Sequence, residues 1–398
     1  MHRNLLKPAC LAILLAVQPA NADQSEPRHE LPGSEVLHLP GDGGVNLEGA
    51  DFTGTLLERF SANWPENLVL APVPGRSPQV GWSLALGGGY FLESKDEDSD
   101  VAPSILGGFG WYSENGSYAY GVGGNLHLLN DDLRVKFGAG YLDVRYRFYG
   151  IGDRQNERDI SLDVLQEAPL FFTSASYRVW KDLYVGLGYM IGEVDTRPKV
   201  VLDPPPFADF DPILTLSLDI GAFVIPVQWD TRDHEQFPRH GWLMTAKTTL
   251  YRESAGGDFD ADIYVLSANH YLPVRQRDVL AFRGYFRKTS GDAPFFLLST
   301  FGGQTDLRGY PSGRYRDKSM YALQGEYRWH ATDKWIFTGF AGFGEVAPGF
   351  SGFGDNFLPA AGVGARFVLS QKHRVSLSFD VAHGKDGTEY YFGVGEAF

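Results

Sequence analysis

From about residue 66 onward the chain shows a two-residue period in hydrophobicity. In 374–383, one face takes Val375, Leu377, Phe379 and Val381, and the other takes Ser376, Ser378, Asp380 and Ala382. The stretches 183–192, 214–224 and 279–287 alternate in the same way. Successive side chains of a strand point to opposite faces, so the pattern predicts β-strands with one apolar and one polar face.

Two architectures accommodate such strands. A soluble β-sandwich buries its apolar faces, whereas a membrane β-barrel turns them outward to lipid. The connections favour the barrel, because tight ones at 130–131, 181–182, 275–277, 331–333 and 371–372 alternate with long ones at 149–168, 198–211, 290–318 and 346–357. One membrane face would then carry turns and the other loops. Two connections depart from this pattern, 229–239 and 93–101.

Counting strands back from Phe398 gives about 16, with a short first strand at 67–71. An even, closed number is expected because each unpaired edge group in lipid costs several kcal/mol. The predicted fold is therefore all-β, a closed antiparallel transmembrane β-barrel of about 16 strands over residues 61–398. The long connections would face the cell exterior if the last strand ends in the periplasm.

The first 22 residues have the pattern of a secretory signal peptide. Arg3 and Lys7 precede an apolar stretch at 9–17 and a small-residue site at 20–22, which predicts cleavage after Ala22. The apolar stretch is shorter than the roughly 20 residues of a membrane anchor. Residues 23–60 are rich in Gly, Pro and acidic residues without a sustained period, which predicts a periplasmic linker or plug-like extension.

Composition and motifs argue against several kinds of site and partner. Cys10 would leave with the signal peptide, so disulfides and thiolate-bound metals are not expected. Without Arg3 and Lys7, 33 basic residues face 49 acidic ones, and a net charge of −16 argues against nucleic acid as a partner. No phosphate-binding loop or nucleophile motif occurs, and the histidines are scattered: His127, His234, His240, His330 and His383. We therefore expect no enzymatic activity, no cofactor and no metal.

Four stretches carry a family resemblance. They are Phe301-Gly-Gly-Gln-Thr-Asp-Leu-Arg308-Gly309-Tyr310, Gly325-Glu326-Tyr327-Arg328, Asp230-Thr-Arg232-Asp233 with Phe237-Pro238 and Gly241-Trp242, and Phe148-Tyr149-Gly150-Ile151-Gly152. Together they resemble the BamA/TamA superfamily of outer-membrane barrels, also called the bacterial surface antigen family. Residues 23–60 are too few for one of that family's periplasmic POTRA repeats, so the chain resembles a barrel-only member lacking POTRA domains.

The resemblance implies that loop six folds into the barrel lumen. Its tip would be Leu307, Arg308, Gly309 and Tyr310, and Arg308 would meet the inner wall. Related barrels supply an Asp acceptor on strand thirteen, where this chain has Gly342. Glu326 and Glu345 are the remaining candidates, and Glu326 is favoured because it follows on the neighbouring strand. The alternative is that Arg308 only orders a long loop.

Two further sites are predicted. Asp230, Arg232 and Asp233 are expected to form a structural lock in a periplasmic turn, with Arg232 between the carboxylates. Tyr390 and Phe392 alternate outward up to Phe398, which resembles the C-terminal signal read by the assembly machinery of the cell. Glu396 departs from this signal, since an apolar residue is usual there, and we expect slower insertion. Exposed aromatic residues near strand ends would form the interfacial girdles: Trp180, Trp329 and Tyr390.

The resemblance implies a non-enzymatic barrel that assembles or translocates protein or lipid at the outer membrane. A weak seam between the first and last strands would admit an incoming strand or lipid, helped by Gly393 and Gly395 in the last strand. The alternatives are a passive, porin-like diffusion channel and, less favoured, a barrel hydrolase. The expected partners are outer-membrane lipid and lipopolysaccharide, the barrel-assembly machinery during biogenesis, and an unknown protein or lipid client, with no nucleic acid.

Overall fold

The computed structural model describes residues 65, 67–77, 80–92, 103–148, 150–152, 162–199, 216–234, 237–300, 302–303, 306–311, 313–354, 356–371 and 375–398. The predicted signal peptide (1–22), the predicted extension (23–60) and the 93–101 connection lie outside them. Among the described residues no helix is long and apolar enough to cross a membrane. The helical elements there are short 3-10 turns at Glu253–Ala255, Phe295–Leu297 and Phe350–Gly352.

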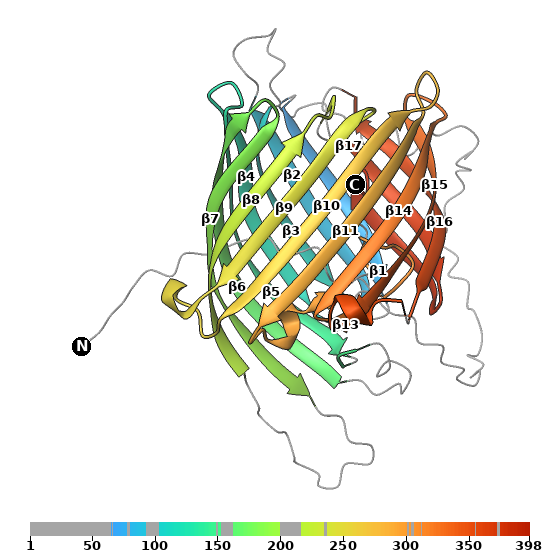
Figure 1. Ribbon diagram of the computed structural model, residues 1–398. Coiled ribbons are helices and arrows are strands. Elements are labelled where there is room, and N and C mark those ends of the chain that lie inside the picture. The colour runs from blue at the N-terminus through green and yellow to red at the C-terminus, as the bar shows by residue number, and fades with distance from the viewer. Residues whose placement is uncertain are drawn as a thin grey trace, which may run out of the picture.

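Sixteen antiparallel strands form one sheet that wraps into a barrel (Figure 1). They are β1 (Leu68–Ser77), β2 (Gly81–Leu92), β3 (Ser104–Ser113), β4 (Tyr118–Leu128), β5 (Leu133–Phe148), β6 (Leu162–Trp180), β7 (Leu183–Lys199), β8 (Leu216–Asp230), β9 (Gly241–Tyr251), β10 (Ala261–Pro273), β11 (Val279–Gly291), β14 (Ser319–His330), β15 (Trp335–Ala347), β16 (Leu358–Ser370), β17 (Val375–Gly384) and β18 (Gly387–Val394). A small separate hairpin pairs β12 (Ser299–Thr300) with β13 (Arg316–Asp317). The predicted all-β fold and strand number are confirmed.

The barrel is nearly closed. Ladders of backbone hydrogen bonds join every consecutive pair in the sheet, from β1 to β18. Strands β1 and β18 are in contact, but among the described residues no ladder joins them. The expectation of full closure is corrected in this respect, and the exception lies where the first and last strands meet.

The long connections after β5, β7, β11 and β15 share one rim, which lies at the bottom of Figure 1. This rim also carries three tight connections, at 78–80, 114–117 and 385–386, while the opposite rim carries the remaining tight turns together with the longer connections 93–103 and 231–240, so length alone does not separate the two rims. Two expected bounds were wrong, because the strands extend beyond them. β6 already begins at Leu162, within the expected loop 149–168, and β1 runs to Ser77 rather than to residue 71. The strands thus extend further toward the long-loop rim than the hydrophobic period alone indicated.

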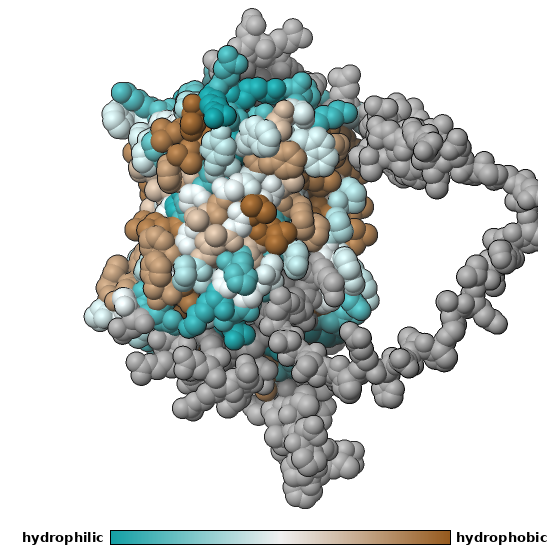
Figure 2. All heavy atoms as spheres, turned by 90° about the vertical axis from the view of Figure 1, so that its right-hand side faces the viewer, coloured by the Kyte–Doolittle hydropathy of each residue, from teal (hydrophilic) through white to brown (hydrophobic). Residues whose placement is uncertain are grey.

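The two faces of the sheet differ as expected for a membrane barrel. Large apolar side chains at alternate positions are 52–64% exposed on the outer face, among them Leu84, Val122, Leu187, Leu266 and Val363. Figure 2 shows hydrophobic residues across the middle of the visible face and hydrophilic ones toward both rims. A soluble sandwich would bury these side chains, so the sandwich alternative is excluded.

Candidate functional site

The tip of the long β11–β14 connection is fully buried. Leu307, Arg308 and Tyr310 are each 0% exposed. Between them, Gly309 has φ +110°, a conformation that favours glycine. A Cβ there would lie 2.9 Å from the side chain of Ala360 and 3.2 Å from the backbone of His383. Glycine is therefore required twice, by the backbone conformation and by the close approach of β16 and β17.

Arg308 is held from three strands. Its Nη2 donates to Oε2 of Glu326 on β14 at 2.7 Å, and its Nη1 donates to Oδ2 of Asp380 on β17 at 2.7 Å. Its Nε donates to Oε1 of Gln324 at 3.3 Å, and its guanidinium lies 3.4 Å from the ring centre of Phe340 on β15. The planar fork of an arginine suits this arrangement, because each edge meets a separate acceptor.

Arg308 belongs to a larger buried network of three arginines and three carboxylates. Arg366 donates through Nη1 to Asp380 at 2.5 Å and through Nε to Glu396 at 3.1 Å. Arg328 donates to Glu326 at 2.8 Å and lies 3.5 Å from Glu396. No side chain in the network exceeds 3% exposure. The charges balance, as buried ionic groups require.

The structure explains why this chain lacks the expected Asp at position 342. A Cβ on Gly342 would lie 2.4 Å from the carbonyl oxygen of Leu323 and 3.1 Å from Leu307, so the loop tip occupies that space. Asp380 supplies a carboxylate from β17 instead. The sequence analysis did not select Asp380 as a partner, although the alternation had placed it on the polar face of its strand.

The two candidate acceptors have different surroundings. Glu326 contacts Arg308 directly. Glu345 alternates to the face opposite Gly342 and Gly344. Its carboxylate accepts hydrogen bonds from the backbone N–H groups of Gly354 and Asn356, at 2.8 Å each, in the β15–β16 connection. The position of Glu345 is therefore that of a loop cap on the outer face.

Two tyrosines fix the backbone of the tip. The N–H of Gly309 donates to the hydroxyl of Tyr391 on β18 at 2.7 Å. The hydroxyl of Tyr310 donates to the carbonyl of Pro359 on β16 at 2.6 Å. Burial raises the pKa of Tyr310 to about 12, so this hydroxyl keeps its proton near neutral pH. The tip is thereby bound to β18, the last strand of the sheet, and to β16.

Residues 395–398, called the tail here, turn away from the outer face. β18 ends at Val394, and Gly395 has φ +84° with its N–H donating to Ser376 at 2.7 Å. Glu396 then meets Arg366 and Arg328, as described above. The main-chain oxygen of Phe398 accepts from Nη2 of Arg328 at 2.6 Å, and its ring packs on a buried cluster formed by Tyr271, Val279 and Ala281.

The tail corrects three sequence-based expectations. Gly395 lies outside the last strand, and neither Glu396 nor Phe398 continues the outward series of Tyr390 and Phe392. Tyr390 is 48% exposed, and both of these aromatic residues pack beside Phe379 on β17. Glu396 is polar because it enters the arginine network, which accounts for its departure from an apolar signal. The role of Tyr390, Phe392 and Phe398 in assembly stays a prediction.

The predicted turn lock between β8 and β9 differs in detail. Arg232 donates through Nε and Nη2 to both oxygens of Asp230, each at 2.8 Å. The carboxylate of Asp233 instead accepts from the backbone N–H groups of Arg239, at 2.8 Å, and His240, at 3.1 Å. Arg232 thus forms a bidentate pair with Asp230, and Asp233 closes the turn. The chemistry is that of a hydrogen-bonded turn.

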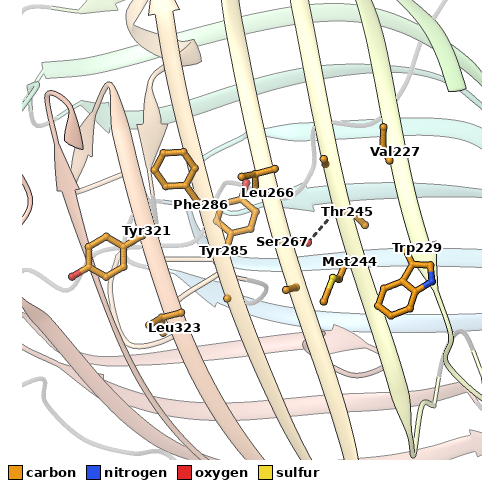
Figure 3. A pocket seen from close by; sticks show the side chains of 13 residues that line it. Val227, Trp229, Met244, Thr245, Leu266, Ser267, Tyr285, Phe286, Tyr321 and Leu323 are labelled. Atoms are coloured by element: carbon orange, nitrogen blue, oxygen red, sulfur yellow. Dashed lines mark hydrogen bonds between the residues drawn. The ribbon is translucent and has the colours of Figure 1, made fainter. Parts of the chain in front are cut away.

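A shallow groove crosses the outer face from β8 to β14 (Figure 3). Its volume is about 500 Å³, and Trp229, Met244, Leu266 and Phe286 are among its lining residues. The walls are almost entirely apolar, whereas a catalytic site needs convergent polar groups. Among the described residues no group of three or more His, Cys, Asp or Glu side chains is arranged to hold a metal ion.

Comparison with known proteins shows what part of the chain, and its fold, are similar to. Residues 219–398 match the Omp85 superfamily domain. The fold is similar to BamA from Haemophilus ducreyi lacking POTRA domains 1–3, at 14% identity and a TM-score of 0.56, over 83% of this chain and 70% of that one. No curated protein matches the chain in sequence.

Two CdiB structures share the fold as well. CdiB from Acinetobacter baumannii matches at 12% identity and a TM-score of 0.52, over 83% of this chain. CdiB from Escherichia coli matches at 13% identity and a TM-score of 0.55, over 84% of this chain. This chain covers 59% and 63% of their lengths, less than two thirds of either. The predicted resemblance is confirmed to this extent: residues 219–398 match the Omp85 superfamily domain, and the barrel has the fold of BamA and CdiB.

Proposed function

We propose that this protein is a non-enzymatic outer-membrane barrel that assembles or translocates a protein or lipid client through an opening between β1 and β18. The observation that carries the proposal is the unpaired seam together with the buried contacts of the loop tip. These contacts join Arg308 to β17 and Gly309 to β18. The Omp85 domain and the barrel fold shared with BamA and CdiB support it.

The seam supplies the driving force. Backbone N–H and C=O groups without a ladder partner are costly in lipid, so an incoming strand that pairs with the edge of β1 or β18 is stabilised. β18 has 8 residues and β1 has 10, and Gly393 within β18 weakens its pairing with Ser378. In this proposal the client adds to the edge and later leaves it.

Arg308 would act as the latch, with loop six occupying the lumen. Asp380 ties Arg308 to β17, and the Tyr391 hydroxyl ties the neighbouring Gly309 to β18. Glu396 in the tail belongs to the same network, because it forms ion pairs with Arg328 and Arg366. Movement of β18 would therefore disturb the contacts of the loop tip, and release of the tip would loosen β18.

Single-channel conductance of the refolded protein in planar bilayers tests the proposal. We expect a low, flickering conductance in the native sequence and a larger, steadier one in Arg308→Ala and in Asp380→Asn. Arg252→Ala is the control, because Arg252 pairs with Asp262 near the long-loop rim, away from the network. A steady native pore that neither network variant changes would contradict a lumenal latch.

The second candidate is a passive diffusion channel. The observation that favours it is that Lys136 and Lys247, on the inner face of β5 and β9, are exposed, as expected of a water-accessible lumen. A constant native conductance with ion selectivity would support this candidate.

Cell location and partners follow from the same proposal. The chain would reach the outer membrane after removal of residues 1–22 and would be inserted by the barrel-assembly machinery. Residues 23–60 would form a periplasmic extension. Outer-membrane lipid and lipopolysaccharide would surround the barrel, and the client would be a protein or lipid.

A further inference from the structure

Charged residues are distributed unevenly over the inner wall. The carboxylates Glu326 and Asp380 lie on β14 and β17 and are paired with arginines. Four cations lie apart from this network: Lys136 on β5, Lys247 on β9 and Arg287 on β11 of the wall, and Arg316 on β13 of the separate hairpin. These four residues are called the inner-wall basic cluster.

Strand register places Arg287 and Lys247 on the inner face. Arg287 alternates with Phe286, which lines the outer groove, and shares its parity with Ala281, the partner of buried Glu326. Lys247 pairs with Val265, and Val265 pairs with Arg287, so the two cations occupy one row two strands apart, about 10 Å. Side chains this long can approach one another further.

The cations lie within electrostatic reach of one another. The charges of Arg287 and Lys136 both act on Lys247, and the charge of Arg287 acts on Arg316. Lys136 and Lys247 are exposed despite their position on the inner wall, so a solute inside the barrel can reach them. Arg316 is 8% exposed, with its guanidinium 5.3 Å from the ring centre of Phe148 and 5.7 Å from that of Phe295.

Carboxylates do not neutralise Lys247, Arg287 and Arg316 within the part of the chain that the structure describes. None of the three has an ion pair there, in contrast to Arg308, Arg328 and Arg366. Arg287 donates through Nη2 to the carbonyl of Leu297, and Arg316 through Nη1 to that of Phe295, each at 2.8 Å. The buried Nε atoms of Arg287 and Arg316 have no hydrogen-bond partner among those residues. Grouped cations of this kind repel unless an anion joins them.

We propose that the inner-wall basic cluster is a binding site for a phosphate-type anion. Arginine forks match phosphate oxygens with paired N–H donors, and lysines add mobile point charges, so one multiply charged anion can bind between Lys247 and Arg287, with Lys136 and Arg316 adding positive charge nearby. A monovalent anion such as chloride would neutralise less charge and accept fewer hydrogen bonds. The inference goes beyond the proposed assembly role and does not rest on it.

Calorimetric titration of the folded full-length protein in a neutral detergent, with inorganic phosphate at constant ionic strength, tests the site. We expect saturable binding that chloride does not reproduce, and affinity about tenfold weaker in Lys247→Met and in Arg287→Met. Lys334→Met is the control, because Lys334 lies in the tight β14–β15 turn at the opposite rim, and its affinity should match the native value. Phosphate heats equal to those of chloride, or an equal loss in Lys334→Met, would overturn the proposal.

A second measurement guards against misfolded variants and identifies the source of the phosphate. Without phosphate at low salt, Lys247→Met should raise the unfolding temperature, because it removes repulsion from Arg287 and Lys136. Added phosphate should raise the native unfolding temperature and raise that of the variant less. Nanodiscs of phosphatidylglycerol, compared with phosphatidylcholine, should abolish phosphate binding if lipid headgroups reach the cluster, and leave it intact if the ligand is soluble. A lower variant unfolding temperature without phosphate would count against the proposal.

Discussion

At the scale of single residues, Arg308 shows which contacts a sequence motif can predict and which it cannot. The sequence identified Arg308 and named Glu326 as an acceptor, and the two lie 2.7 Å apart. Asp380 could not be chosen from the sequence, because 72 residues separate it from Arg308 and only the sheet wrapping brings them together. The same holds for Glu396, whose inward turn depends on the left-handed backbone of Gly395.

Removing the Arg308 guanidinium should destabilise the barrel by about 3 kcal/mol, the lower end for breaking a buried ion pair, since Arg328 and Arg366 still neutralise the two carboxylates. Arg308→Lys should recover only part of this, because a compact ammonium lacks the planar fork whose separate edges reach Glu326, Asp380 and Gln324. Urea unfolding in micelles measures the loss. The control is Arg147→Ala, whose exposed pair with Asp163 should contribute at most about 1 kcal/mol. Equal losses in the two alanine variants would contradict a special role for burial.

Asp131, in the tight β4–β5 turn, should make stability depend on pH. Burial would raise its pKa, but hydrogen bonds from His127, Arg134 and Tyr184 outweigh this and hold the pKa well below its ordinary value. A lowered folded pKa contributes stability that is full above the ordinary pKa of about 4 and is lost as the pH falls through the folded pKa. Unfolding of Asp131→Asn between pH 7 and pH 2 should therefore differ from the native protein most at pH 7. Asp132→Asn in the same turn is the control, and a difference that grows toward acid pH would refute the assignment.

At the scale of elements, β15 shows a glycine serving a distant loop. Gly342 and Gly344 lie on the inner face of β15, and a Cβ on either would lie 3.1–3.2 Å from Leu307 in the loop tip. The sequence analysis read Gly342 only as a missing Asp. The alternation could not show that this space belongs to a side chain 35 residues earlier, since a hydrophobic period describes which face a residue takes but not what fills it.

Gly342→Ala should loosen the loop tip. The new methyl group would lie 2.4 Å from the Leu323 carbonyl and 2.6 Å from Gln324, so β14 and the tip must shift, at a typical overpacking cost of about 1–3 kcal/mol. We expect faster proteolysis of the β11–β14 connection and a lower unfolding temperature. Gly339→Ala on the same strand is matched, because a Cβ there meets nothing within 4 Å. If both variants are cleaved at the native rate, β15 does not position the loop.

At the scale of the whole molecule, strand number and the outward apolar face were predictable because both follow from local periods. The state of the seam was not. Closure depends on whether β18 pairs with β1 in a fixed register. These strands lie at opposite ends of the sequence, and the hydrophobic pattern of one does not predict its pairing with the other. The tail adds to this, because it directs the chain beyond Val394 onto the inner wall and away from β1.

The unpaired seam should appear in hydrogen exchange. Within the described part of the chain, amide groups of β1 and β18 that face the seam have no ladder partner, whereas those of β10 are paired with β9 on one side and β11 on the other. Amide exchange tracks local opening, so β1 and β18 should exchange well before β10 in the refolded barrel. Arg308→Ala should accelerate exchange in β18 in particular, because Tyr391 loses a fixed partner in Gly309. Uniform protection around the barrel would mean that the seam is as firmly paired as the rest, and an incoming strand would then have no edge to join.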